Sequence, residues 1–231
     1  MQAVPRPIRL FLKALKRLAI NARTLAREQG FSRSVREGLP VDASGAALPW
    51  YTYPAIEYLG QFDFRGRAVF EYGAGNSSRF WTARGAAVCA VENDERWYAE
   101  LAASVPRLDI ELCRAKDDYV GSIARRGRVF DLIAIDGVWR RACANAAPAH
   151  LAPGGAIVMD NSDRHPQATA DLRARGFLQV DFNGFGPVNA YAWTTSLFVK
   201  ADWPLQRAFR DPAPVGGLRE YVAEDDDAPR L

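Results

Sequence analysis

The fold is decided by residues 68–78, which read Ala-Val-Phe-Glu-Tyr-Gly-Ala-Gly-Asn-Ser-Ser. The run Ala68–Phe70 is short and apolar, which is typical of a buried strand, and the acidic side chain of Glu71 follows it directly. Gly73 and Gly75 permit a tight turn and let a ligand approach the backbone closely. The stretch therefore predicts a strand that ends in a glycine-rich ligand-binding loop.

A helix is expected to start where this loop ends, because Ser77 or Ser78 can cap it. The free N–H groups at a helix N-terminus favour a carboxylate. Glu71, at the strand end, is well placed to accept a hydrogen bond from an ammonium group. An amino-acid moiety carries both charges, so the loop suits a ligand with an amino-acid end.

Apolar runs and helical stretches alternate along the rest of the chain. Strands are expected at Ala68–Phe70, Val88–Val91, Leu108–Leu112, Leu132–Ile135 and Ala156–Met159, with helices near 77–84, 94–104, 118–126 and 139–150. Two later strands, Phe177–Phe182 and Ser196–Val199, are joined by a Gly-rich loop and suggest an antiparallel hairpin. The sequence therefore predicts an α/β fold. We expect a doubly wound, mostly parallel seven-stranded sheet with a terminal antiparallel strand and helices on both faces.

Four parts follow one another along the chain. They are a basic amphipathic N-terminal helix (1–38), a linker and aromatic-rich cap segment (39–61), the α/β domain (62–200) and a Pro-rich, acidic tail (201–231). The first part holds nine basic residues against Glu28 and Glu37, so the rest of this chain of formal charge +3 is mildly acidic. An acidic body argues against a nucleic-acid partner.

The N-terminal helix is expected to cover residues 7–28. Apolar residues recur there at helical spacing with basic residues between them: Ile8, Phe11, Leu12, Leu15, Leu18 and Leu25. We expect this apolar stripe to pack on the domain or on a second subunit of a homo-oligomer. The alternative is an anchor at a membrane surface, because Lys and Arg flank the stripe.

The cysteines and the lengths of the apolar runs indicate a cytoplasmic protein. Cys89, Cys113 and Cys143 share no metal-ligand spacing, and their odd number excludes a complete set of disulfides. No apolar stretch approaches the roughly 20 residues that span a bilayer. The N-terminus lacks the uninterrupted apolar core of a signal peptide.

A second acidic residue ends the next strand. Glu92 lies seventeen residues after Gly75, and an acid at this place can accept hydrogen bonds from both hydroxyls of a ribose. Further polar residues follow the fourth and fifth strands, where ligands of such sheets bind: Asp136, then Asp160 and Asn161.

These motifs resemble class I, Rossmann-like S-adenosylmethionine-dependent methyltransferases. The resemblance rests on Glu-x-Gly-x-Gly-x-Ser at 71–77, the acid at Glu92, Ile135-Asp136-Gly137, and Leu-Ala-Pro-Gly-Gly at 151–155 before a strand. It covers about residues 62–200 in the expected order, and Ser77 stands where many members have a third glycine. By this resemblance the cofactor is S-adenosylmethionine, and the residues expected around it are Glu71, Tyr72, Gly73, Gly75, Asn76, Ser77, Glu92, Asn93, Asp117, Asp118 and Asp136. Asp117 and Asp118 would face the adenine, or else simply cap a helix.

Asp136, Asp160 and Asn161 also resemble the cation ligands of catechol O-methyltransferase-like enzymes. Three oxygen ligands suit Mg²⁺, which would bind the acceptor hydroxyl and lower its pKa. Those enzymes carry a lysine three residues after the first Asp, where this chain has Trp139 followed by Arg140. The alternative is that these are polar strand-end residues without a metal.

Asp136 and His165 are the candidate catalytic residues, with His165 as a general base near neutral pH or else a surface histidine. Aromatic residues are expected to wall an acceptor pocket or to pack in the core: Trp50, Tyr51, Tyr53, Phe185, Tyr191 and Trp193.

The function predicted is methylation of a hydroxyl on a small-molecule or sugar-like acceptor. One rival is a non-catalytic or membrane-associated module with the same fold. The other is an NAD-dependent oxidoreductase, which would need a glycine at Ser78.

Overall fold

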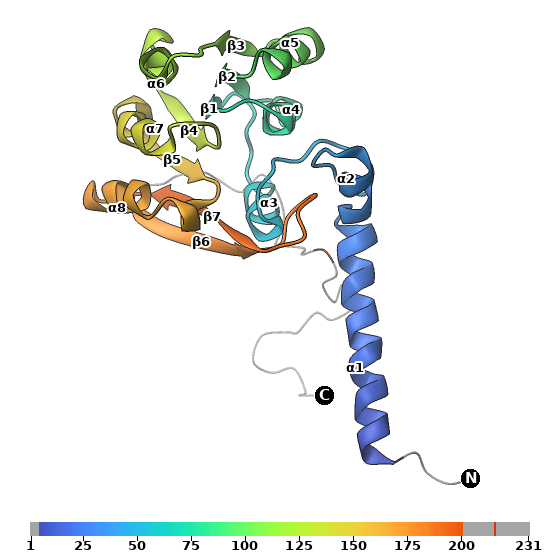
Figure 1. The fold of residues 1–231 in the computed structure, drawn as a ribbon. Coiled ribbons are helices and arrows are strands. Elements are labelled where there is room, and N and C mark those ends of the chain that lie inside the picture. Colours follow the sequence, from blue (N-terminus) through green and yellow to red (C-terminus); the bar gives the residue numbers. More distant parts are fainter. Residues whose placement is uncertain (1–4, 201–214, 216–231) are drawn as a thin grey trace.

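The computed structural model describes residues 5–200 and Val215. Within these residues, seven strands form one sheet in the order β3-β2-β1-β4-β5-β7-β6 (Figure 1). The strands are β1 (Ala68–Tyr72), β2 (Ala87–Glu92), β3 (Asp109–Leu112), β4 (Phe130–Ile135), β5 (Leu151–Met159), β6 (Leu178–Gly184) and β7 (Trp193–Val199). The strands from β3 to β5 pair in parallel, whereas β7 runs antiparallel to both β5 and β6. The predicted fold class is confirmed, including the terminal hairpin.

Helices cover both faces of the sheet (Figure 1). One face carries α3 (Tyr53–Leu59), α4 (Asn76–Ala83) and α5 (Glu95–Ser104). The other face carries α6 (Lys116–Arg125), α7 (Arg140–Ala146) and α8 (Pro166–Ala174). Two short 3₁₀ segments, η2 (Ala147–His150) and η3 (Ser162–Arg164), flank β5. The connections through α4 and α5 lie on one face, those through α6 and α7 lie on the other, and the strand order reverses between β1 and β4.

Two apolar clusters form the core, one on each side of the sheet. The first joins the sheet to α6, α7 and α8 through side chains such as Tyr119, Cys143 and Leu172. The second joins it to α3 and α4 through side chains such as Leu59 and Trp81. All three cysteines are buried as free thiols.

The N-terminal part is not one helix. It consists of α1 (Arg6–Arg23), a π-helical turn η1 (Thr24–Glu28) and α2 (Phe31–Glu37). Gly30 separates η1 from α2 with a φ of 81°, in the left-handed region, and a Cβ there would collide with the backbone of Asp42. A glycine is therefore required where the chain turns from the long helix into the domain.

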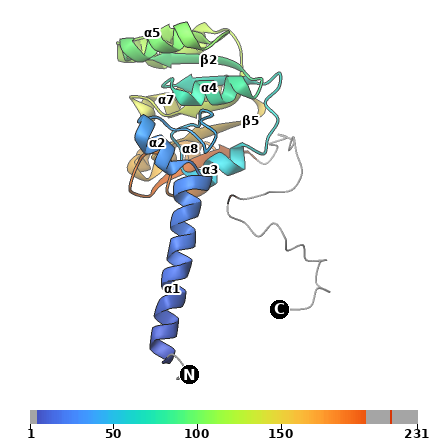
Figure 2. The ribbon, with the colours of Figure 1, turned by 90° about the vertical axis from the view of Figure 1, so that its right-hand side faces the viewer.

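The body of α1 stands away from the domain (Figures 1 and 2) and contains no buried residue. The expectation that this helix packs along its own domain is therefore wrong. Only the base is attached, where Leu25 packs on the second core cluster and Gln29 Nε2 donates to Glu57 Oε1 at 2.9 Å. Among the described residues, no helix is long and apolar enough to cross a membrane.

Two further details differ from the sequence prediction, and a third lies outside the described residues. Helices α2 and α8 were not predicted. The Leu-Ala-Pro-Gly-Gly run at 151–155 lies inside β5 instead of before it, at a point where the register with β4 shifts. The predicted tail, residues 201–231, lies outside the described residues apart from Val215.

Candidate cofactor and acceptor site

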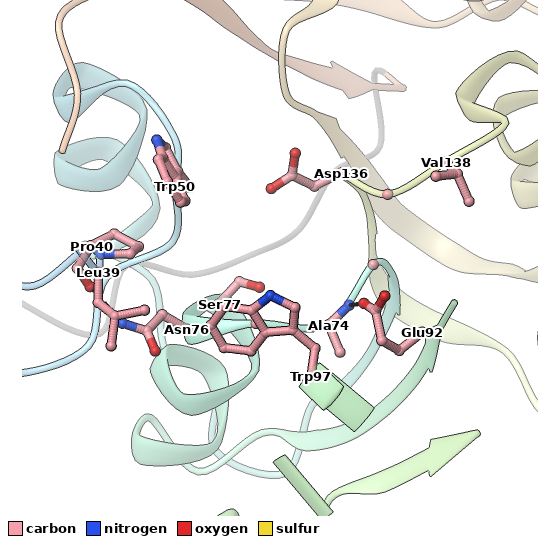
Figure 3. Close-up of a pocket in the computed structure, with 13 residues that line it drawn as sticks. Leu39, Pro40, Trp50, Ala74, Asn76, Ser77, Glu92, Trp97, Asp136 and Val138 are labelled. Atoms are coloured by element: carbon pink, nitrogen blue, oxygen red, sulfur yellow. Dashed lines mark hydrogen bonds between the residues drawn. The ribbon is translucent and has the colours of Figure 1, made fainter. Parts of the chain in front are cut away.

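A cavity of about 340 Å³ lies at the carboxyl ends of β1, β2 and β4, where the strand order reverses. This is the place where ligands of open α/β sheets bind. Its walls come from the loop after β1, the ends of β2 and β4, helix α5 and the segment that follows α2 (Figure 3). The lining residues are Leu39, Pro40, Trp50, Gly73, Ala74, Gly75, Asn76, Ser77, Glu92, Trp97, Asp136, Gly137 and Val138.

The floor of the cavity is made by two glycines that touch. Gly73 has a φ of 95°, and a Cβ on it would lie 2.6 Å from the backbone nitrogen of Gly137. A Cβ on Gly137 would in turn collide with the hydroxyl of Tyr119. By contrast, a Cβ on Gly75 would meet nothing within 4 Å. Gly73 and Gly137 are therefore needed for packing, whereas Gly75 leaves open space for a ligand.

Glu71 is fully buried beneath the glycine loop. Its carboxyl group accepts hydrogen bonds from the Ser78 hydroxyl and from Trp81 Nε1. Burial raises the pKa of Glu71 to about 7, and the hydrogen bonds oppose the shift. Ser78 Oγ also accepts from the N–H of Gly75 at 3.3 Å, so it helps to cap α4 as expected.

Glu92 lines the cavity with its carboxyl group held from three directions. Oε2 accepts from the N–H of Ala74 at 2.9 Å, and Oε1 accepts from the N–H groups of Asn93 and Asp94 at 2.8 Å each. Burial raises its pKa, while these three hydrogen bonds lower it. The backbone donors fix the position of the carboxylate, which is the arrangement that recognition of a diol requires.

The remaining residues predicted for the cofactor fall into two groups. Asn76 and Ser77 line the cavity, and Asn76 is held by its Nδ2, which donates to the carbonyl of Pro40 at 2.8 Å. Tyr72 instead points into the core on the other side of the sheet, where its hydroxyl donates to the carbonyl of Val120. Asp117 and Asp118 are exposed in the first turn of α6, and they and Asn93 do not line this cavity.

Six lining residues are absent from the predicted site residues: Leu39, Pro40, Ala74, Trp97, Gly137 and Val138. Trp97 lies on α5, five residues after Glu92, and this short spacing from the strand end could have revealed it. Leu39 and Pro40 lie in the turn after α2, and nothing in their local sequence connects them to the glycine loop. They reach the cavity through the hydrogen bond between Pro40 and Asn76.

Asp136 follows β4, and its carboxylate points toward the Trp50 side of the cavity (Figure 3). Its Oδ1 accepts from Arg140 Nη2 at 3.0 Å, and the two side chains are 21% and 13% exposed. Burial raises the pKa of Asp136, and the guanidinium of Arg140 opposes that shift.

Arg140 also reaches the end of β5. Its Nη1 donates to the carbonyl of Asp160 and to Asn161 Oδ1, the latter at 3.2 Å, and its Nε donates to the carbonyl of Gly137 at 2.9 Å. The carboxyl group of Asp160 accepts instead from Trp193 Nε1 at 2.9 Å and from the Thr195 hydroxyl at 2.5 Å. Burial raises the pKa of Asp160, and the neighbouring Asp136 adds to the shift.

These contacts decide how well the trio of Asp136, Asp160 and Asn161 fits a metal ion. Each of the three side chains already accepts a hydrogen bond, two of them from Arg140. The described residues contain no cluster of three His, Cys, Asp or Glu side chains that could hold a metal. As placed, the trio does not fit Mg²⁺, because Arg140 donates to the side-chain oxygens of Asp136 and Asn161 while Trp193 and Thr195 donate to Asp160.

His165 lies on the other side of Gly137 and Val138. It lines a second, more open cavity of about 570 Å³ together with Arg140 and Trp139. Burial, with a contribution from Arg140, lowers its pKa from the ordinary value of 6.5, so the imidazole is neutral at pH 7.

Some of the aromatic residues predicted around the acceptor line the first cavity, and others lie at the surface or in the core. Trp50 lines the cavity, whereas Phe185 and Tyr191 are about half exposed. Tyr51 is completely buried, and its hydroxyl has no hydrogen-bond partner among the described residues. Burial raises the pKa of this hydroxyl, and the nearby carboxyl groups of Asp136, Glu71 and Asp160 raise it further. Tyr51 is thus a neutral donor beside the acidic groups of the site.

Comparison with known proteins gives structural relatives only. No family model and no curated protein matches the sequence. Thermoplasma acidophilum 1320 superposes with a TM-score of 0.51 at 16% identity, over 75% of this chain and 96% of that one. A methyltransferase from Pyrococcus furiosus gives 0.46 at 19% identity, over 80% and 98% of the two chains. Precorrin-6y C5,15-methyltransferase from Geobacter metallireducens gives 0.48 at 16% identity, over 64% and 87%.

The chain has the class I methyltransferase fold. Its strand order and its single antiparallel strand β7 agree with the resemblance seen in the sequence. At identities below one fifth the likeness shows the fold alone, because one fold supports many functions. What a protein of this methyltransferase fold does must be argued from its site.

Proposed function

We propose that this chain is an S-adenosylmethionine-dependent methyltransferase that methylates a hydroxyl group of a small molecule without a metal ion. The observation that carries the proposal is the fixed carboxylate of Glu92 at one side of a cavity whose floor is the glycine loop. A ribose diol can donate to this carboxylate. The aromatic ring of Trp97, on the same wall, offers a surface for an adenine.

The amino-acid end of the cofactor fits the other side of the loop. The N-terminus of α4, which follows Gly75 at the cavity, offers N–H groups to a carboxylate. Asp136 supplies a carboxylate at the far wall, where a positive charge is favoured. The cofactor would supply a methyl group on a positively charged sulfur, which is transferred by in-line displacement.

The acceptor is expected between Trp50 and Asp136. These side chains face the cavity from opposite walls (Figure 3). The buried hydroxyl of Tyr51, which has no hydrogen-bond partner among the described residues, interacts electrostatically with Asp136. Asp136 can accept the proton that the acceptor hydroxyl loses as its oxygen forms the new bond to carbon. Arg140 holds Asp136 in place and balances its charge. The protein thus contributes chiefly by positioning the reactants and excluding water.

The Mg²⁺ ion expected from the sequence is left out of the proposal, since Arg140 already donates to Asp136 and Asn161. His165 remains a candidate base that would act from the second cavity, next to Arg140. The NAD-dependent rival is disfavoured by Ser78, which is buried and donates to Glu71 at the place where a glycine would be needed.

Calorimetry with S-adenosylhomocysteine tests the proposal. We expect micromolar binding by the full chain and no heat with NADH. Glu92→Gln should weaken the binding by about 1–3 kcal/mol, because ribose hydroxyls lose a charged acceptor. Glu95→Gln is the matched control, since Glu95 is exposed and, within the part of the chain that the structure describes, forms an ion pair with Arg114 alone. Equal affinity of the Glu92 variant, or preferential binding of NADH, would overturn the assignment. Transfer of a labelled methyl group to hydroxylated small molecules then separates an enzyme from a binding module.

A further inference from the structure

The helix α1 has two different faces. At about 100° per residue, five of its seven large apolar side chains, Ile8, Phe11, Leu12, Leu15 and Leu18, fall with three alanines in one arc of roughly 160°. The opposite arc carries the six basic residues Arg6, Arg9, Lys13, Lys16, Arg17 and Arg23, together with Leu10, Ile20 and Asn21. The helix contains no acidic residue. It is therefore amphipathic, and every charged residue on its polar face is basic.

Neither face has a partner within the described chain. Phe11 is 63% and Leu18 64% exposed, and the other apolar residues of this face are about half exposed. The helix extends from the domain for about 27 Å at 1.5 Å per residue, and both views show it free of the sheet and its helices (Figures 1 and 2). So large an apolar stripe on an exposed helix indicates an interaction surface.

We propose that α1 binds flat on an anionic lipid surface, with its apolar face buried at the acyl boundary and its basic face among the phosphate headgroups. The positive charge of the helix is the reason for proposing an anionic partner. Six basic residues without an acid need negative charge from outside, and a basic amphipathic helix of this length lies in the plane of a membrane interface. Its apolar face requires more than a polyanion alone, because phosphate contacts would leave the leucines in water.

A second copy of α1 is the competing occupant. Apolar residues do recur at spacings of three and four, but 18 residues hold fewer than the three to four heptads that indicate a coiled coil. The positions beside that seam hold Leu12, Ala14, Ala19 and Asn21, which cannot form interhelical ion pairs. Two copies would also bring twelve positive charges together. A charged lipid surface resolves this repulsion, whereas a second helix increases it.

The base of the helix supports the same geometry. Leu25 and Gln29 attach the segment to the domain, and Gly30 fixes the turn into α2. The free part therefore projects in one direction from a firmly held base. This attachment lets the helix lie on a surface while the domain stays folded beside it.

Co-sedimentation of the full chain with vesicles tests the proposal. Vesicles of phosphatidylcholine alone are compared with vesicles that also contain phosphatidylglycerol. We expect binding to the anionic vesicles only, reduced at high salt. Replacing Arg9, Lys13, Lys16 and Arg17 by Gln should lower the partition coefficient at least about 100-fold. Replacing Phe11 and Leu15 by Ser should lower it to a similar extent. A control variant, Arg65→Gln with Arg114→Gln and Arg173→Gln, removes exposed charge elsewhere and should bind normally.

Two labelled variants report which face enters the lipid. Phe11→Cys and Lys13→Cys lie two residues apart and on opposite faces, and the three native cysteines are buried and should react slowly. A polarity-sensitive dye at position 11 should shift to the blue with anionic vesicles, and a dye at position 13 should not. Equal binding to neutral vesicles would overturn the proposal. Binding that the Ser variant retains would identify a polyanion site instead, and a dimer without lipid that the Ser variant abolishes would identify a second copy. Because α1 has no buried residue, these variants should keep the melting temperature of the domain, which serves as the check on folding.

Discussion

The backbones of Gly73 and Gly137 touch where β1 and β4 end, so that neither residue has room for a side chain. The contact joins the first glycine of the cofactor loop to the residue after Asp136. It brings the binding loop and the proposed acceptor side to a common floor. The distance between the two halves of the site is therefore set by backbone packing instead of by flexible side chains.

Gly73→Ala should destabilise the protein by about 2–4 kcal/mol, because it adds a left-handed strain to a backbone collision. Gly75→Ala is the matched control, two residues away, with an extended φ of −179° and open space around it. It should keep the melting temperature and lose affinity for S-adenosylhomocysteine, since its methyl group enters the cavity. Urea unfolding and calorimetry measure the two effects. Equal free energies of unfolding for the two variants would show that the contact between Gly73 and Gly137 does not contribute to stability.

Arg140→Leu should cost about 3 kcal/mol of stability, because it leaves the largely buried carboxylate of Asp136 without its counter-charge. Arg141→Leu is the neighbouring control. Arg141 is 56% exposed and pairs with Asp171 at the surface, so its loss should change little. Denaturant unfolding near pH 7.5 measures both variants. Equal losses would show that the pair with Asp136 is no more important than a surface ion pair.

Removal of divalent cations should leave methyl transfer unchanged. The guanidinium of Arg140 donates hydrogen bonds to Asp136 Oδ1 and Asn161 Oδ1, the oxygens that a cation would use. A chelator does not remove these hydrogen bonds. Initial rates with and without excess EDTA, using an acceptor found in the labelled-methyl screen, provide the measurement. A loss of activity that Mg²⁺ restores would return the trio of Asp136, Asp160 and Asn161 to the role of metal ligands.

The stability of the protein should fall as the pH rises from about 5 to 8, in part because of Glu71. The pKa of Glu71 is about 7 in the folded state against an ordinary value of 4.5. Between pH 4.5 and 7 the carboxyl group is therefore protonated in the folded state and ionised in the unfolded state. The favourable contribution is complete below pH 4.5 and is lost as the pH passes 7. Glu71→Gln cannot ionise. The stability difference between the two proteins should therefore change by up to about 3 kcal/mol over this range, as measured by unfolding at several pH values. Parallel pH dependences would contradict the assignment.

His165→Ala should flatten the acidic limb of the pH–rate profile if the imidazole is the base. Burial and Arg140 lower its pKa below 6.5, so the limb should lie below that pH. Gln167→Ala, in the first turn of the same helix α8, is the control and should keep the limb. An unchanged limb in the His165 variant would leave Asp136 as the proton acceptor.

The sequence predicts the sheet and the strand-end acids because both depend on local patterns. Glu71 and Glu92 directly follow apolar runs, and parallel strands bring their carboxyl ends to one edge. The three helices of the α/β alternation before β4 are predicted for the same reason. Helix α8 is missed because its short amphipathic pattern follows a loop rich in polar residues.

The contacts between distant segments could not be predicted in this way. Pro40 reaches Asn76 across 36 positions, and no periodicity relates the two. Arg140 could be seen in the sequence as a replacement for the expected lysine. Its turn back between β4 and β5, however, depends on Trp139, which adopts a φ of 49° in the left-handed region that non-glycine residues seldom adopt. Such a conformation is set by tertiary packing.

The segment that leaves α1 runs through η1 and α2 directly into Leu39 and Pro40, which form a wall of the cavity. A change in this short stretch of chain on lipid binding would reach a wall of the cavity. The free energies of lipid binding and ligand binding would then be linked, and linkage is reciprocal. If vesicles tighten or weaken the affinity for S-adenosylhomocysteine by some factor, S-adenosylhomocysteine must alter the affinity for vesicles by the same factor. Arrival at a lipid surface would then be communicated to the cofactor pocket without any second protein.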